Sequence, residues 1–211
     1  TQETKYLDQS GALWKVLSSK APEKSKEIKQ AEKATGKHVK GELDTYVREA
    51  KDYRYNFGTK PDFWRWDITH AEAMQFIKKY EQGHALKTSE FNRWYELAIV
   101  FDMESDLKTT KKAMAYIDKT LLAVRDLWGV IKTIREEYEI VSNGIWDELD
   151  TDAMESQSKR MVKSVRKMPR DVRGQDAFDG IADMAKNYMV VVPLIAAILH
   201  PSMRPRHWDL M

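Results

Sequence analysis

The chain has 211 residues, of which 32% are charged and 42% are hydrophobic, with only 9 glycines and 6 prolines. This composition favours long charged helices over a β architecture with many turns. Cysteine is absent, which excludes disulfides and thiolate metal sites and fits a reducing cytoplasmic setting. The formal net charge of +2 gives no general reason to expect a nucleic-acid partner. We therefore expect an all-α protein, an elongated bundle of long antiparallel helices.

The beginning of the chain lacks the order of basic, apolar and small residues that marks a signal peptide, and no Met initiates it. We therefore expect an internal fragment of a larger intracellular protein. The longest apolar run, residues 188–199, contains Pro193 and is well short of the ~20 residues that span a bilayer. This length predicts no membrane span.

Residues 1–66 give the weakest helical signal. Apolar side chains within residues 12–17 indicate a first helix, whereas residues 21–40 are rich in lysine and poor in large apolar side chains. The latter stretch is expected to be exposed helix or partly mobile. Helical spacing resumes within residues 43–50, and the breakers Gly58 and Pro61 end it.

This break sets the predicted domain boundary. Residues 1–66 form one domain and residues 67–211 form a second, helical bundle. Trp64 and Trp66 follow the break, and their alternation is typical of extended backbone, so we expect one of them to cover a neighbouring element.

The next helix should begin near residue 69, because Thr69 and Glu72 have the spacing of a capping box. Its apolar positions run from Ala73 to Phe101. Gly83 lies in the middle of this pattern and predicts either one kinked helix or two abutting ones.

The longest predicted helix covers residues 105–141. Its apolar positions alternate spacings of three and four, with a skip of three before Ile134. Such a skip overwinds a coiled-coil seam, so the helix should pack in a bundle. Trp128 lies in the seam and should be buried, and Asn143 and Gly144 should stop the helix in the left-handed conformation.

Two shorter helices follow. Met161 and Val165 mark one that should end at Pro169, and Phe178 begins the apolar pattern of another that should end near Pro193. With the helices before them, they should form an antiparallel bundle.

Catalysis finds little support in the sequence. Residues 36–41 have the glycine spacing of a phosphate-binding loop, but Glu42 and Leu43 follow where Lys and Ser or Thr are required, so we expect a flexible basic turn. Glu81 and His84 have the spacing of two metal ligands on one helix face, but no second such pair accompanies them, so we expect an ordinary surface pair. We therefore predict no enzymatic activity and no catalytic, cofactor-binding or metal-binding residue in this segment.

A strip of cations recurs at helical spacing away from the apolar positions. It consists of Lys159, Lys163, Arg166, Arg170 and Arg173. One interpretation is a solvated helix face. The other is a docking surface for an acidic protein, because only Glu155 interrupts the positive charge nearby.

Residues 200–208 read His-Pro-Ser-Met-Arg-Pro-Arg-His-Trp, and they closely resemble a stretch of the linker in dynein heavy chains. There the pattern Asn/His-Pro-x-Met/Leu-Arg-x-Arg-His-Trp is characteristic. The matching positions are His200, Pro201, Met203, Arg204, Arg206, His207 and Trp208. The resemblance continues backward through residues 193–195, 168–169 and 146–150, whereas Pro205 replaces an acidic residue of many members. The residue pattern is most similar to that of axonemal heavy chains of the outer-arm type.

The resemblance implies a non-catalytic mechanical element that joins the tail (residues 1–66) to the start of the linker (residues 67–211). Such an element transmits the ATP-driven motion of the motor ring for microtubule-based movement, while ATP and Mg belong to the ring, which this segment lacks. The implied partners are the tail and ATPase ring of the same heavy chain. Other dynein heavy, intermediate or light chains and an axonemal regulator are further candidates, with no nucleic acid and no membrane. The implied location is the cytoplasm and cytoskeleton, in the axoneme of a cilium or flagellum.

Two alternatives stay open at this point. One is a helical adaptor or scaffold module unrelated to motors. The other is a basic nucleic-acid-binding helical domain that uses residues 20–40 and 159–173, which salt-dependent retention on nucleic acid would favour and which the balanced net charge argues against.

Overall fold

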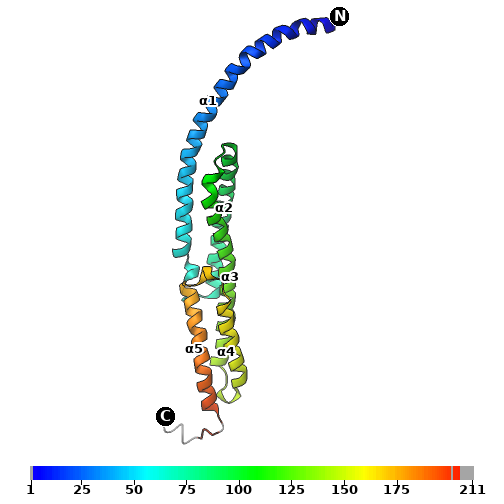
Figure 1. Cartoon of the computed structure of the whole chain (residues 1–211). Helices are drawn as coiled ribbons and strands as arrows, with labels where there is room; N and C mark the ends of the chain where they lie inside the picture. Colours follow the sequence, from blue (N-terminus) through cyan, green and yellow to red (C-terminus); the bar gives the residue numbers. More distant parts are fainter. Residues whose placement is uncertain (1, 201, 205–211) are drawn as a thin grey trace. The chain divides into compact units, whose positions relative to one another are not determined.

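A computed structural model describes residues 2–200 and 202–204 (Figure 1). Within these residues the regular structure is all helical, with no strand, which confirms the predicted fold class. The α-helices are α1 (Gln2–Thr59), α2 (His70–Val100), α3 (Lys108–Ser142), α4 (Thr151–Arg166) and α5 (Asp176–Leu199). Short 3-10 helices lie between them: η1 (Asp62–Trp64), η2 (Glu104–Leu107), η3 (Trp146–Glu148) and η4 (Arg170–Val172).

The chain divides into two compact units, each with its own core. The first comprises the described residues up to 52 together with residues 92–110. The second comprises residues 53–91 and the described residues from 111 onward. The predicted assignment of residues 1–66 and 67–211 to two functional domains stays a prediction.

The first unit pairs α1 with the end of α2. The face of α1 that carries Val39, Leu43 and Tyr46 is buried, at the spacings of four and three that helix packing requires. Tyr46 stacks on Trp94 with ring centroids 5.7 Å apart, and Lys40 forms an ion pair with Asp106. Because these partners run in opposite directions along the sequence, the two helices are antiparallel.

The predicted basic turn at residues 36–41 is wrong, since this stretch lies inside α1. Gly36 is buried, and a Cβ atom there would lie 3.4 Å from the ring of Phe101. A Cβ atom at this distance would make an ordinary van der Waals contact, so Gly36 packs against Phe101 as a helical residue and forms no turn. Of the two expectations for residues 21–40, the helical one holds, and the stretch is exposed except at the buried Gly36 and Val39.

In the second unit, α2 begins with the predicted capping box. The Thr69 N–H donates to Glu72 Oε2 at 2.8 Å, and the Glu72 N–H donates to Thr69 Oγ1 at 3.2 Å. The helix continues through Gly83 to Val100, so the alternative of two abutting helices is excluded.

The apolar face of α3 is buried as predicted. Ile117, Val124, Trp128 and Ile131 are each fully buried. However, α3 has 35 residues and α1 has 58, so α3 is not the longest helix as predicted. The error arose because residues 21–40 lack the apolar stripe by which helices are recognised in sequence.

The end of α3 lies where predicted, but its conformation differs. Among the described residues, only Asp102 (φ 55°) and Gly174 (φ 76°) have positive φ, so Gly144 is not left-handed. Its N–H instead donates to the Val141 carbonyl at 3.2 Å, and a Cβ atom on it would lie 3.1 Å from Leu149 Cδ2. Glycine is therefore used here to admit a neighbouring side chain.

Helices α4 and α5 pack against each other in antiparallel order. The Tyr188 hydroxyl donates to Gln157 Oε1 at 3.0 Å, while the Arg173 side chain reaches the backbone of Arg166. As predicted, α4 ends before Pro169, and the Asp150 carboxylate caps its start by accepting two backbone N–H groups.

The prediction that the last helix ends near Pro193 is wrong, because α5 continues to Leu199. Proline removes one hydrogen bond, to the carbonyl four residues earlier, and Met189 at that position is exposed. Among the described residues, α5 is the one helix long and apolar enough to cross a membrane, with 22% of its most apolar stretch buried, so the absence of a membrane span stays a prediction. One of its faces, which includes Ile181, Ala185 and Val192, is buried in the core of the second unit.

Candidate functional site

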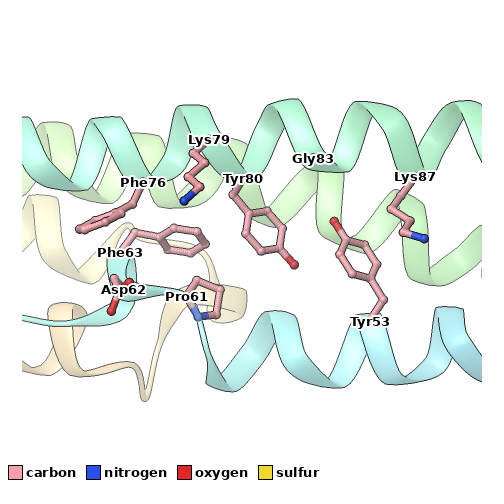
Figure 2. A pocket seen from close by; sticks show the side chains of 9 residues that line it. All are labelled: Tyr53, Pro61, Asp62, Phe63, Phe76, Lys79, Tyr80, Gly83 and Lys87. Atoms are coloured by element: carbon pink, nitrogen blue, oxygen red, sulfur yellow. The ribbon is translucent and has the colours of Figure 1, made fainter.

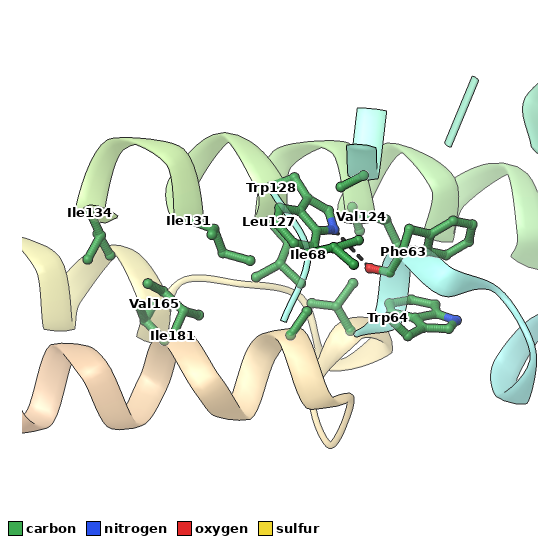
Figure 3. Packing of buried hydrophobic residues seen from close by; sticks show 14 of the residues in the cluster. Phe63, Trp64, Ile68, Val124, Leu127, Trp128, Ile131, Ile134, Val165 and Ile181 are labelled. Atoms are coloured by element: carbon green, nitrogen blue, oxygen red, sulfur yellow. Dashed lines mark hydrogen bonds between the residues drawn. The ribbon is translucent and has the colours of Figure 1, made fainter. Parts of the chain in front are cut away.

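The connection between α1 and α2 folds back onto the core of the second unit. The indole N–H of Trp64 donates to the Phe57 carbonyl at 2.9 Å. The indole N–H of Trp128 on α3 donates to the Phe63 carbonyl at 2.8 Å, and Trp128 is fully buried (Figure 3). The prediction that Trp128 is buried in the seam is therefore confirmed. These bonds fix a loop whose backbone would otherwise lack partners in the core.

Arg135 on α3 holds the next part of this connection. Its guanidinium donates to the carbonyls of Ile68 at 2.8 Å and Trp66 at 2.7 Å. It also lies over the Trp66 ring, 4.0 Å from the centroid. Burial lowers the pKa of Arg135 from its ordinary value, which is expected for a charge that is partly removed from water.

Trp66 in turn packs against α5. The Trp66 N–H donates to the Asp176 carboxylate at 2.7 Å. A Cβ atom on Gly180 would lie 2.2 Å from Trp66 Cδ2, which is too close for two non-bonded carbon atoms, so the ring occupies the place of a side chain. This confirms the expectation that Trp64 or Trp66 covers a neighbouring element. We call the group of Trp66, Arg135, Asp176 and Gly180 the Trp66 clamp.

Sequence reasoning missed three of the four clamp residues. Arg135 follows the seam residue Ile134 and resembles an ordinary surface cation, and Asp176 resembles a local helix-start residue. Gly180 gave the only usable signal, because a glycine inside an apolar helical pattern usually has a packing reason.

A chain of polar side chains, with the buried His84 at its centre, also joins three helices of the second unit. His84 on α2 is buried; its Nδ1 lies 3.0 Å from the Tyr53 hydroxyl on α1. Its Nε2 lies 3.0 Å from Asp118 Oδ1 on α3. The predicted surface pair of Glu81 and His84 is therefore wrong, because Glu81 forms an ion pair with Arg125 on α3 and His84 points inward. Tertiary partners separated the two side chains that the helical spacing had placed together.

A cavity of about 460 Å³ opens beside these polar side chains, between α1, α2 and η1 (Figure 2). Aromatic side chains line it, and the ring centroids of Tyr53 and Tyr80 lie 6.0 Å apart. Burial raises the pKa of both tyrosines, so their hydroxyls are weaker acids than usual. The cavity therefore lacks an activated nucleophile among these hydroxyls, although it offers an apolar surface.

The structure separates the predicted cationic strip into two parts. Lys159, Lys163 and Arg166 share one exposed face of α4, where Lys159 also pairs with Glu155 at 2.5 Å. Arg173 turns back and donates to the Arg166 and Met168 carbonyls, both at 2.9 Å, and so it caps the end of α4. Arg170 is exposed on η4. The docking role of the strip stays a prediction.

The predicted family motif is described only in part. The N–H groups of Ser202 and Met203 donate to Nδ1 and the carbonyl of His200, which forms a turn directly after α5. Arg204 is exposed. The remaining motif positions, Pro201, Arg206, His207 and Trp208, lie outside the described residues.

The fold defines the chain as an all-α segment built of long helices. Comparisons with known proteins indicate which family of all-α proteins it resembles. Residues 114–211 match the family described as dynein heavy chain, N-terminal region 2. The dynein alpha chain of the flagellar outer arm from Chlamydomonas reinhardtii is 26% identical over 205 residues, which cover 97% of this chain and 4% of the relative. The dynein-1-beta heavy chain of the flagellar inner arm I1 complex from the same organism is 22% identical over 208 residues, or 99% of this chain and 4% of the relative. Human dynein axonemal heavy chain 9 is 25% identical over 97 residues, or 46% of this chain and 2% of the relative.

The chain is therefore similar to the N-terminal region of dynein heavy chains, over residues 114–211 by the family match and over nearly its whole length by the first two relatives. It spans about 4% of the length of the first two relatives, and the matched part is an N-terminal region rather than the ATPase ring. This similarity favours a segment of a motor protein over an unrelated adaptor, and it adds no support to the nucleic-acid-binding alternative.

Proposed function

We propose that this chain is a non-catalytic mechanical element that joins the tail of a dynein heavy chain to the start of its linker. In this role it passes the ATP-driven motion of the motor ring toward the tail, and so it serves microtubule-based movement. The observation that carries the proposal is the Trp66 clamp, because it ties the connection between α1 and α2 to α3 and α5 at one point.

The clamp suits load transfer for a physical reason. Close-packed side chains resist small displacements, so a force on one helix moves its packed neighbours with it instead of bending one helix alone. At the clamp, a charged hydrogen bond from Arg135, a cation–π contact with the same guanidinium and a close contact with Gly180 hold the same residue, Trp66. Packed elements of this kind change between discrete arrangements rather than deforming continuously.

The proposed partners follow from the family. They are the tail and ATPase ring of the same heavy chain, with other dynein heavy, intermediate or light chains or an axonemal regulator as further candidates. ATP and Mg would act in the ring, with no cofactor, nucleic acid or membrane bound by this segment. The relatives carry flagellar and axonemal names, which supports our proposal that the protein acts in the cytoskeleton of a cilium or flagellum.

The test compares movement with ATP hydrolysis in the full-length heavy chain. Trp66→Ala removes the ring that covers α5, and Gly129→Ala on α3 is the matched control because nothing lies within 4 Å of its Cβ position. We expect Trp66→Ala to lower microtubule gliding velocity relative to the ATPase rate, while Gly129→Ala behaves as wild type. Circular dichroism at the assay temperature verifies that the variant is folded. An unchanged ratio of velocity to ATPase rate in folded Trp66→Ala would refute the mechanical role.

A further inference from the structure

A second surface of this unit lies on the other side of α5 from the Trp66 clamp. Between α4 and α5 there is a groove of about 300 Å³. Val162 on α4 and Phe178, Ala182 and Met189 on α5 form much of its apolar lining. Met189 is nine positions after Gly180, which at 100° per residue places it on the opposite side of α5. The groove is therefore separate from the clamp, and its role does not depend on the mechanical one.

The groove has the form of a receptor for a helix. Phe178, Ala182 and Met189 follow one another at spacings of four and seven, so they make a continuous row along α5. Ala182 leaves a depression between two larger side chains. Met189, with 40% of its surface exposed, is unbranched and adapts to the shape of a partner side chain. A helix that carries apolar residues at matching spacings can lay them along such a row.

Cations border this apolar row on both sides. Arg166 and Arg173 lie on the side of α4, and Lys186 lies on the side of α5. Lys186 has an acidic neighbour, Asp183, whose carboxylate is 3.5 Å away and mostly exposed, and so weakly bound.

The cationic face of α4 extends the same border. Lys159 and Arg166 are three positions before and four positions after Val162, so helical spacing places both beside the apolar lining. Neither Lys163 nor Arg166 pairs with a carboxylate within the described part of the chain. The α4 side of the border is thus positively charged apart from Glu155, whereas Asp179 and Asp183 accompany Lys186 on the α5 side.

We propose that this groove binds an acidic amphipathic α-helix of a partner chain. The apolar row of that helix would insert between α4 and α5, and Asp or Glu residues on its flanks would meet the cations of the border. Such a partner explains why an exposed apolar row and the cations of α4 lie side by side here. A solvated face needs no exposed apolar row, and a binding site for a free anion needs none either.

The test uses the 211-residue chain and a labelled synthetic helical peptide with one stripe of Leu flanked by Glu on both sides. Fluorescence anisotropy measures its affinity at low and at high salt. We expect binding that weakens in high salt, because exposed charges are screened. A peptide with the same Leu stripe flanked by Lys should bind at least tenfold more weakly, as like charges oppose docking.

Variants on the two parts of the groove separate its contributions. Replacing Lys159, Lys163 and Arg166 by Gln should weaken binding of the Glu-flanked peptide by about tenfold, the sum of several modest exposed pairs. Ala182→Glu should abolish it, because a carboxylate then stands in the apolar row. The control replaces three other exposed lysines of the same unit, Lys78, Lys112 and Lys132, by Gln and should leave the affinity unchanged.

Several results would overturn the proposal. Equal binding of the Glu-flanked and Lys-flanked peptides would mean nonspecific apolar contact. Equal loss in the triple variant and in its control would mean a general charge effect. Binding to vesicles of anionic phospholipid that the Glu-flanked peptide does not displace would assign the surface to a membrane instead.

Discussion

Gly180→Ala tests the Trp66 clamp with a single methyl group. In an ordinary helix interior this change stabilises the protein by up to about 1 kcal/mol, because alanine is the better helix former. At Gly180 the new Cβ would lie 2.2 Å from Trp66 Cδ2 and 2.5 Å from Cγ, at the root of the indole rather than its flexible end. The ring cannot move away without losing its contact with the Arg135 guanidinium, and the hydrogen bond from the Trp66 backbone N–H to Asp176 holds the backbone in place.

The magnitude follows from two opposing effects. Overpacking a fixed contact costs about 1–3 kcal/mol, and the gain in helix propensity offsets up to about 1 kcal/mol of that. We therefore expect Gly180→Ala to lower the free energy of unfolding by about 1–2 kcal/mol. For a chain of this size, that lowers Tm by roughly 2–8 °C.

Gly129→Ala supplies the matched comparison in the same unit. Gly129 lies inside α3, and nothing lies within 4 Å of the position of its Cβ. The propensity effect then acts alone, so Tm should rise by about 1–4 °C. Thermal unfolding followed by circular dichroism measures both variants. If Gly180→Ala stabilises the chain as much as Gly129→Ala, the close contact between Trp66 and α5 does not exist in solution.

Three further changes probe the same unit by urea or thermal unfolding. Trp128→Ala should lower the free energy of unfolding by about 3–5 kcal/mol, because it empties a fully buried site. The control Trp14→Ala, on α1, should change stability little because that side chain is 69% exposed. Equal effects of the two changes would place that face of α3 in solvent. Arg135→Met keeps the apolar stem but removes the donors to two loop carbonyls, so the free energy of unfolding should fall by about 1–3 kcal/mol. Arg135→Lys should not restore this loss, because lysine lacks the planar pair of donors. Full stability of the lysine variant would contradict the contact with both carbonyls. Hydrogen bonds from Thr69 hold the pKa of Glu72 below its ordinary value of 4.5, so its stabilisation is present above that pH and lost as pH falls through the lower folded value. The stability difference between wild type and Glu72→Gln should therefore shrink in acid, and a constant difference from pH 7 to pH 2 would exclude this linkage.

The parts of the fold that local rules control were predictable. The capping box at Thr69 depends on residues three positions apart, and the buried face of α3 depends on spacings of three and four. Both kinds of information lie within a few turns of one helix. The end of α4 before Pro169 has the same local origin, since proline cannot donate the next helical hydrogen bond.

The helix breakers were overestimated for a common reason. Glycine costs a helix only about 1 kcal/mol, so packing along a long helix outweighs it at Gly36 and Gly83. Pro193 costs more, about 3 kcal/mol in a helix interior, but Val192 and Ile195 on either side still contact the core. Tertiary contacts therefore decide whether a breaker ends a helix, and a single sequence does not reveal those contacts.

The contacts of the Trp66 clamp could not be predicted from local sequence rules. Asp176 lies in the first turn of α5, where an acidic residue complements the helix dipole, so local rules assign it to its own helix. Its carboxylate instead accepts the N–H of a residue 110 positions earlier. Trp66 depends on this bond because it lies outside the regular helices, where no neighbouring turn supplies an acceptor for its N–H. Asp176 therefore lies in the first turn of α5 and also binds the backbone of a distant loop, so it couples the helix to the loop. This coupling supports the proposal that the clamp transfers load.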